Sequence, residues 1–121
     1  MSLSGFYLEF PMTCRIISCD EMACFIKTGD MISVDTRPSN MFKRFRIINS
    51  MNYKEFCISV ENIGDLSEMK IVFVCSRGHK SFRLGSIFSR KNKIDTYSLE
   101  GGLNELIRKH PDLVVMGNDI R

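Results

Sequence analysis

The sequence predicts an α/β fold in which a mostly parallel sheet is covered by helices. Segments with strand character alternate with segments whose apolar residues repeat at helical spacing, which is the pattern of β-α-β units. Residues 71–74 are apolar at every position, as expected of a central strand that is buried on both faces. With 121 residues, 44% of them hydrophobic and 26% charged, the chain has the size and composition of one domain, residues 1–121.

The first strand, helix and second strand each have a signal. Residues 13–17 are rich in β-prone side chains. Ser18 and Glu21 have the spacing of a capping box, so a helix is expected to begin after Ser18. Gly29 is suited to end that helix, and the compact apolar run 31–35 then predicts a buried strand.

The next elements are shorter. Asn40 is suited to cap a short helix that reaches Phe45, and residues 47–48 are a candidate third strand. A further amphipathic helix follows, because apolar side chains recur there at i, i+3, i+4 and i+7. These are Tyr53, Phe56, Cys57 and Val60.

The pattern after the central strand predicts a helix over residues 81–92, a weaker strand over 96–99, and a last helix that ends before Pro111. The tail from Val114 is left unassigned. In sheets of this kind ligands bind beyond the carboxyl ends of the strands. Two places meet that description, residues 35–37 and the segment that begins at Cys75.

Positive charge is concentrated in two segments without acidic residues, 37–46 and 70–93. They carry four and seven Lys or Arg side chains, so a net charge of +3 leaves −8 for the rest of the chain. An anionic ligand near these segments is one interpretation, and a solvated surface is the other. The basic segments lack interleaved aromatic side chains, so nucleic acid is not an expected partner.

Cysteine spacing and hydropathy argue against a metalloprotein, a membrane protein and a secreted protein. The five cysteines include no CxxC pair and there are two histidines, so neither a metal site nor another cofactor is expected. No apolar run spans a bilayer and no secretory signal opens the chain, so we expect a cytoplasmic protein without a membrane partner. Four cysteines are expected to pack in or near the core as small hydrophobes. They are Cys14, Cys19, Cys24 and Cys57.

The turn after the central strand is the candidate active site. Residues 75–81 form a short basic turn, in which Gly78 provides conformational freedom. The backbone amides of such a turn can converge on one point, and the helix that follows adds its positive N-terminal end. These amides, with Arg77 and Lys80, favour the thiolate of Cys75, which makes it a candidate nucleophile beside an anion site.

Two chemistries use a cysteine in this setting. Attack on a phosphate ester in the manner of tyrosine phosphatases needs an arginine six residues after the cysteine, and that position is Ser81 here. Attack on a sulfane sulfur gives a cysteine persulfide and a small anion such as sulfite. The tight loop and the register of Arg77, Lys80 and Arg83 favour the sulfur chemistry.

At these residues the chain resembles the rhodanese family of sulfurtransferases, over residues of about 15–111. Residues 31–37 are similar to the family's apolar strand ending in Asp-x-Arg. Residues 75–81 are similar to its active loop, with Lys80 at the position of an arginine. Residues 99–103 match its Leu-x-Gly-Gly pattern before the last helix.

The chain also departs from the family pattern. Within residues 42–52, Phe45-Arg46-Ile47 stands where Gly-His-Ile is usual. The tryptophan that usually follows the glycine pair is absent, and the chain contains no Trp. Lys80 keeps the positive charge but lacks the planar fork of arginine, which implies an altered donor preference rather than a lost nucleophile.

The resemblance implies a five-stranded parallel sheet flanked by helices on both faces, with the persulfide carried by Cys75. The loop amides would hold the terminal sulfur, and basic side chains would attract a small anionic sulfur donor. Asp35 is expected to form a buried ion pair that orders the loops, with Gly101 and Gly102 as structural residues near the site. The implied substrate-binding residues are Ser76, Arg77, Gly78, His79, Lys80, Ser81 and Arg37.

Three hypotheses for the function follow. The first is a sulfurtransferase that moves a sulfane sulfur from thiosulfate or a persulfide donor to a thiophilic acceptor through Cys75. The alternatives are a catalytically silent binding or regulatory module with the same fold, and a Cys-dependent phosphatase or arsenate reductase. An acidic protein that accepts the sulfur is one candidate partner for the basic segments.

Overall fold

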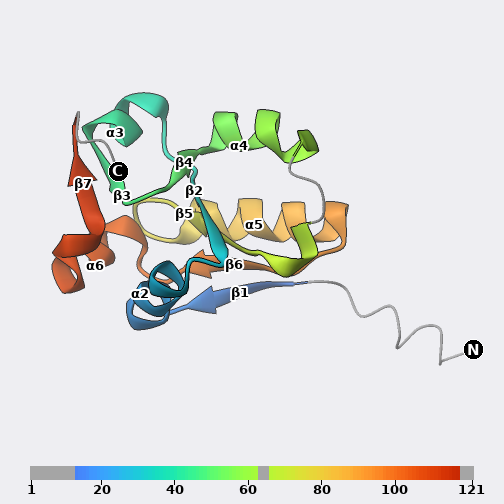
Figure 1. The fold of residues 1–121 in the computed structure, drawn as a ribbon, viewed down its shortest axis with the longest axis horizontal. Helices are drawn as coiled ribbons and strands as arrows, with labels where there is room; N and C mark the ends of the chain where they lie inside the picture. The colour runs from blue at the N-terminus through green and yellow to red at the C-terminus, as the bar shows by residue number, and fades with distance from the viewer. Residues whose placement is uncertain (1–12, 63–65, 118–121) are drawn as a thin grey trace, which may run out of the picture.

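A five-stranded parallel sheet forms the centre of the molecule (Figure 1). The structure is a computed structural model that describes residues 13–62 and 66–117. The predicted fold class is therefore confirmed. The strands, in their order across the sheet, are β1 (Cys14–Ile17), β6 (Thr96–Leu99), β5 (Lys70–Val74), β2 (Met31–Asp35) and β4 (Met51–Asn52).

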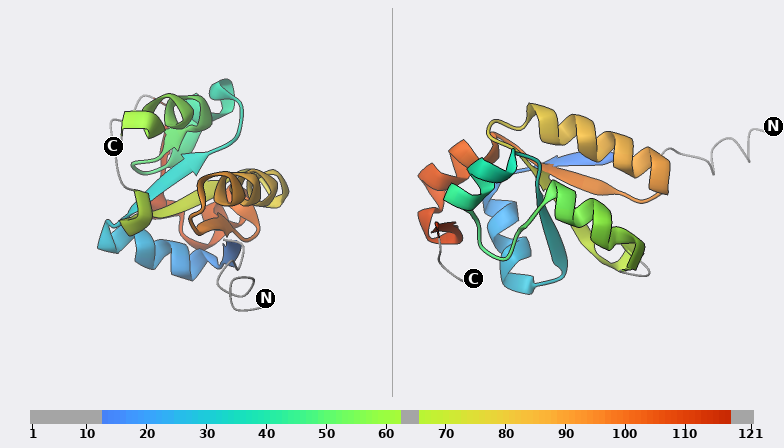
Figure 2. Two further views of the ribbon diagram at one scale, coloured as in Figure 1. Left: turned by 90° about the vertical axis from the view of Figure 1, so that its right-hand side faces the viewer. Right: turned by 90° about the horizontal axis from the view of Figure 1, so that it is seen from above.

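Helices cover both faces of this sheet (Figure 2). One apolar cluster joins the sheet to α2 (Cys19–Thr28) and α6 (Gly102–Lys109), and the other joins it to α4 (Tyr53–Ser59) and α5 (His79–Asn92). The central strand β5 contributes to both, because its side chains alternate between the faces. Val72 and Val74 pack in the first cluster, and Ile71 and Phe73 in the second.

The capping box predicted for α2 is present. The amide of Glu21 donates to Oγ of Ser18 at 3.1 Å, and the amide of Ser18 donates to Oε1 of Glu21 at 3.0 Å. Gly29 ends the helix with a left-handed φ of 79°. Helix α5 begins two residues earlier than expected, at His79, with Gly78 as its N-cap.

Three expectations for residues 40–48 need correction, and the unassigned tail contains a strand. Helix α3 (Ser39–Arg44) is capped by Pro38, so Asn40 lies inside the helix rather than at its cap, and Phe45 lies beyond its end. The strand expected at 47–48 is β3 (Phe45–Ile47), and it pairs antiparallel with β7 (Val114–Met116) in a separate two-stranded sheet. The strand that pairs with β2 at this edge of the parallel sheet is instead the two-residue β4.

Short 3-10 helices complete the fold: η1 (Val60–Asn62), η2 (Leu66–Glu68) and η3 (Pro111–Leu113). Cys14 and Cys19 are buried as expected, but Cys24 and Cys57 are exposed, so their predicted core positions are wrong. Cys57 has the helical spacing of the apolar stripe, but the neighbouring Phe56 fills the core. Among the helices that the structure describes, none is long and apolar enough to cross a membrane.

The two caps differ in a way that unfolding experiments can measure. Ser18→Ala removes the hydroxyl that accepts from Glu21, so the free energy of unfolding should fall by about 1 kcal/mol. Asn40→Ala serves as the matched control, because α3 has no side-chain cap bond; its stability should stay within about 0.5 kcal/mol of the parent. Equal losses in the two variants, in urea titrations, would contradict this assignment of the caps.

Candidate active site

Cys75 lies at the carboxyl end of β5, where residues 76–78 lead into α5. It is 5% exposed, and its sulfur accepts hydrogen bonds from two backbone amides. The amide of Gly78 donates to Sγ at 3.0 Å, and the amide of Ser81, in the first turn of α5, donates at 3.3 Å. The convergence of loop amides expected from the sequence is therefore centred on this sulfur.

These contacts favour the thiolate. Burial raises the pKa of the Cys75 thiol, but hydrogen bonds outweigh that effect, and the net pKa lies below its ordinary value of 9.0. The bonds come from the hydroxyl of Ser81 and from the amides of Ser81, Gly78 and Arg77. Cys14 and Cys19 show the opposite behaviour, because burial raises the pKa of both thiols.

The start of α6 fixes the backbone of this loop. The amide of Leu103 donates to the carbonyl of Cys75 at 2.8 Å, and that of Asn104 donates to the carbonyl of Ser76 at 3.1 Å. Gly102, at the start of α6, packs against the active loop with a φ of 65°. A Cβ at this position would come within 2.5 Å of the Cys75 and Ser76 backbone. Gly101 has a φ of 75°. The Gly-Gly pair therefore permits the close approach of α6 to the loop.

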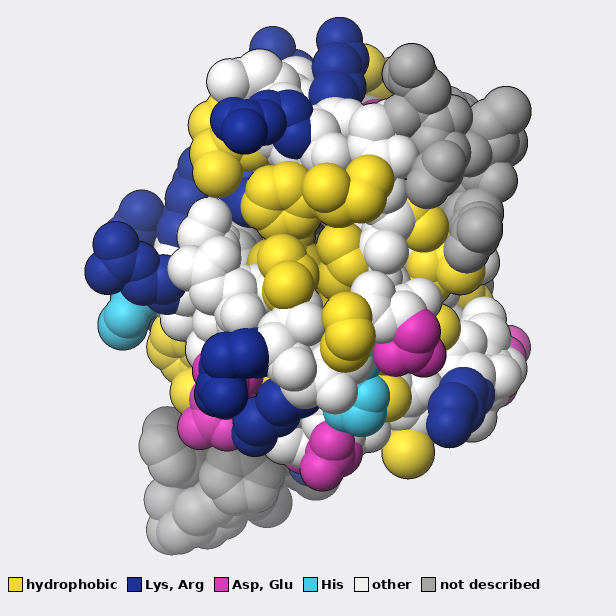
Figure 3. All heavy atoms as spheres, turned by 90° about the vertical axis from the view of Figure 1, so that its left-hand side faces the viewer, with side chains coloured by type: hydrophobic (Ala, Val, Ile, Leu, Met, Phe, Trp, Pro, Cys, Tyr) yellow, Lys and Arg dark blue, Asp and Glu magenta, His cyan; other side chains and the backbone are white. Residues whose placement is uncertain are grey.

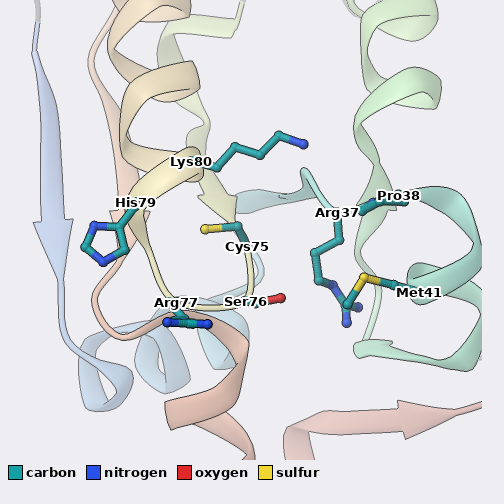
Figure 4. Close-up of a pocket in the computed structure, with 8 residues that line it drawn as sticks. All are labelled: Arg37, Pro38, Met41, Cys75, Ser76, Arg77, His79 and Lys80. Carbon is teal, nitrogen blue, oxygen red and sulfur yellow. The ribbon is translucent and has the colours of Figure 1, made fainter.

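A hollow of about 290 Å³ opens beside Cys75 (Figure 4). Cys75 and Ser76 lie between Arg77 and His79 on one side and α3 with the end of β2 on the other. The side chain of Lys80 extends from the start of α5 across the mouth. The residues that line the hollow are Arg37, Pro38, Met41, Cys75, Ser76, Arg77, His79 and Lys80.

Arg37 lines this hollow, but its guanidinium is occupied elsewhere. Nη2 lies 2.8 Å from Oδ2 of Asp35 and also donates to the carbonyl of Phe45, whose ring lies 4.7 Å from the guanidinium carbon. Both members of the Asp35–Arg37 pair are buried, with side chains 2% and 3% exposed. The structure thus contains the expected ion pair. A role of Arg37 in substrate binding stays a prediction.

Charge is unevenly distributed around the site. Figure 3 views the side of the molecule that carries α3, α6 and β7, and Lys and Arg side chains gather along its upper and left margins around a central hydrophobic group. Arg77, His79 and Lys80 are exposed at the hollow, and Lys43 and Arg44 are exposed on the neighbouring helix α3. Arg83 and Arg90 are also exposed but belong to α5 and do not line the hollow.

Sequence reasoning missed three residues that the structure places here. Pro38 and Met41 give the hollow an apolar wall. Ser98 on β6 is 1% exposed and its hydroxyl lies 2.8 Å from that of Ser81. Within the described residues, no three His, Cys, Asp or Glu side chains are grouped closely enough to hold a metal ion.

Comparisons with known proteins agree with this fold. A model of the rhodanese-like domain matches residues 18–109. The thiosulfate sulfurtransferase from Pseudomonas aeruginosa is similar with a TM-score of 0.72 at 12% identity, over 92% of this chain and 21% of that chain. No curated protein sequence matches the chain.

Two smaller proteins are similar over most of both chains. A rhodanese-related protein from Thermoplasma volcanium has a TM-score of 0.64 at 20% identity, covering 79% of this chain and 93% of that one. The As-Sb reductase from Leishmania major has a TM-score of 0.66 at 16% identity, covering 84% and 85%. Identities this low show a shared fold and do not separate the activities.

Gly102 offers a test of the contact between α6 and the loop. Gly102→Ala should lower the free energy of unfolding by about 2–5 kcal/mol, because the new Cβ meets the Cys75 and Ser76 backbone at a positive φ. Gly29→Ala is the control, since Gly29 has a φ of 79° with no atom within 4 Å of an added Cβ, and the loss there should be about 1 kcal/mol. Similar losses at both positions would rule out the close approach.

The ionisation of Cys75 can be followed by its rate of alkylation with iodoacetamide as a function of pH. The thiolate is the reactive form, and its pKa is lowered in the folded chain, so the midpoint of the profile should lie below that of the same cysteine in urea. Between the two midpoints the folded chain then holds the larger thiolate fraction. A folded midpoint at or above 9.0 would show that burial outweighs the hydrogen bonds.

Proposed function

The chain belongs to the family of rhodanese-like domains, and we propose that it is a sulfurtransferase that carries a sulfane sulfur as a persulfide on Cys75. The donor is thiosulfate or a persulfide, and the acceptor is a thiophile. The observation that supports this proposal best is the pair of amide hydrogen bonds, from Gly78 and Ser81, that converge on a sulfur beside an open hollow. Such a site favours a thiolate and an anionic sulfur attached to it.

The reaction proceeds in two displacements. The Cys75 thiolate attacks the outer sulfur of thiosulfate, so that a new S–S bond forms while the bond to the sulfonyl sulfur breaks and sulfite leaves with the electron pair. An acceptor thiolate or cyanide then attacks the terminal sulfur, and Cys75 departs as a thiolate. Arg77 and Lys80, at the mouth of the hollow, attract the dianionic donor.

Phosphoryl transfer is less well supported by the same loop. The sixth position after Cys75 holds Ser81, which is buried and hydrogen-bonded to the cysteine sulfur, so no guanidinium is available there to hold phosphate oxygens. Lys80 lies one position earlier, at the surface, and offers a point charge in place of a fork. These differences favour transfer of a single sulfur atom.

The acceptor that fits the surface is an acidic protein carrying a thiol. Its charge would face Arg77 and Lys80 at the mouth and Lys43 and Arg44 on α3, whose Met41 lines the same hollow. Such complementary charge speeds encounter more than it tightens binding.

Intact-protein mass spectrometry after incubation with thiosulfate tests the proposal. We expect a gain of one sulfur atom that a reducing agent reverses and that Cys75→Ala abolishes, because no other thiol has converging loop amides in the described part of the chain.

The exposed cysteines supply the matched controls. Cys24→Ala and Cys57→Ala should both retain the full sulfur load. A load that persists in Cys75→Ala would sink the proposal, and so would a parent chain that takes up no sulfur while Cys75 is still free to react with iodoacetamide.

A further inference from the structure

Two buried hydroxyl groups connect the sulfur of Cys75 to strand β6. Oγ of Ser81 lies 3.3 Å from Sγ of Cys75, and Oγ of Ser98 lies 2.8 Å from Oγ of Ser81. The two serines are 0% and 1% exposed, so water does not compete for either hydroxyl. They come from different elements, α5 and β6, and meet only in the folded chain.

The direction of the hydrogen bonds follows from the number of acceptors. Among the residues that the structure describes, Ser81 is the hydrogen-bond partner of the Ser98 hydroxyl, so the buried Ser98 proton is donated to Oγ of Ser81. The proton of Ser81 must then go elsewhere. Two acceptors lie within reach, the carbonyl of Gly78 at 3.3 Å and the sulfur of Cys75 at 3.3 Å.

We propose that Ser98 is a positioning residue, which orients the Ser81 hydroxyl so that its proton is donated to the Cys75 sulfur when that sulfur is ionised. In the thiol form, Cys75 donates to Oγ of Ser81, and Ser81 donates to the carbonyl of Gly78. Loss of the thiol proton to solvent leaves a strong acceptor at Sγ. The Ser81 hydroxyl then rotates from the Gly78 carbonyl to the sulfur, while Ser98 keeps donating to the same oxygen.

The effect of Ser98 is transmitted wholly through Ser81. A hydroxyl that accepts a hydrogen bond donates a stronger one, so Ser98 strengthens the bond from Ser81 to the thiolate. The same hydrogen bond also restricts rotation of the Ser81 side chain within the core. The inference rests on the proposed function in one respect, namely that Cys75 reacts as a thiolate.

Charged groups around the hollow act on the same sulfur and remain unchanged in serine variants. They are Arg77, His79 and Lys80 of the loop and α5, the Asp35–Arg37 pair after β2, and Glu100 after β6, which lines an adjacent hollow with Arg77 and His79. Their common contribution therefore cancels when a serine variant is compared with the parent chain.

The test is the pH profile of iodoacetamide alkylation at Cys75, measured in the parent, Ser98→Ala, Ser81→Ala and the double variant. Ser98→Ala should raise the midpoint, making alkylation about threefold slower below it, and Ser81→Ala should slow it about tenfold. The double variant should match Ser81→Ala, because Ser98 has no route to the sulfur without Ser81. Loss of a merely structural contact would not move the midpoint.

Ser33→Ala is the matched control, since Ser33 is a strand serine of β2 that is 2% exposed and has no hydrogen-bond partner within the described residues. Its alkylation profile should equal that of the parent. An unchanged midpoint in Ser98→Ala, or a double variant whose shift is the sum of the single shifts, would overturn the role of Ser98. Sulfur loading from thiosulfate is measured separately, so a parent that fails to load refutes the proposed function while the alkylation profiles still decide the role of Ser98.

Discussion

The geometry of the active loop depends on two hydrogen bonds from α6. The amides of Leu103 and Asn104 bind the carbonyls of Cys75 and Ser76, so both carbonyls are engaged by α6. The peptide units that follow can then direct their amides toward the cysteine sulfur, as Gly78 does. A carbonyl oxygen turned toward the sulfur would disfavour its ionisation. The backbone around Cys75 is thus held by a helix that begins at residue 102.

The other side of the hollow is fixed by a buried ion pair. Asp35 accepts from both the backbone amide and the guanidinium of Arg37, which places the turn after β2 in one conformation. Removing two charges from water is unfavourable, and the pair compensates through several hydrogen bonds and through stacking of Arg37 on Phe45. We therefore attribute to this pair the conformation of the turn after β2 rather than a large gain in stability. It connects β2 and the turn after it with Phe45 of β3, across the hollow from the loop.

The sequence predicts elements whose signals are local. The capping box at Ser18, the doubly buried strand β5 and the Cys75 loop all depend on residues close together in the chain, and the structure contains each of them. The pairing of β3 with β7 joins residues about seventy positions apart through three-residue strands, which are too short to have a periodic signal. Asn40 has the residue type of a cap, but the backbone is still extended at Pro38, with a ψ of 150°, and becomes helical at Ser39, one residue before Asn40. Ser98 had no signal, because a lone serine in a strand acquires its partner only when β6 packs against α5.

Under the proposed function, the side chains that attract the donor are separate from the groups that activate Cys75. Arg77 and Lys80 are exposed at the rim, so their fields reach into solvent and are screened by salt. The amides of Gly78 and Ser81 act within 3.3 Å of a buried sulfur, where little water or salt can intervene. Lys80 in place of the family's arginine therefore changes a group at the rim of the hollow, where the proposed donor would enter, and leaves unchanged the amides that favour the thiolate. The apolar wall of Pro38 and Met41 lies across the hollow from the loop. Under the proposed function, donor preference is therefore determined at the rim and at this wall, while the reactivity of Cys75 is determined by the loop amides and, through the proposed role of Ser98, by the hydroxyl groups behind them.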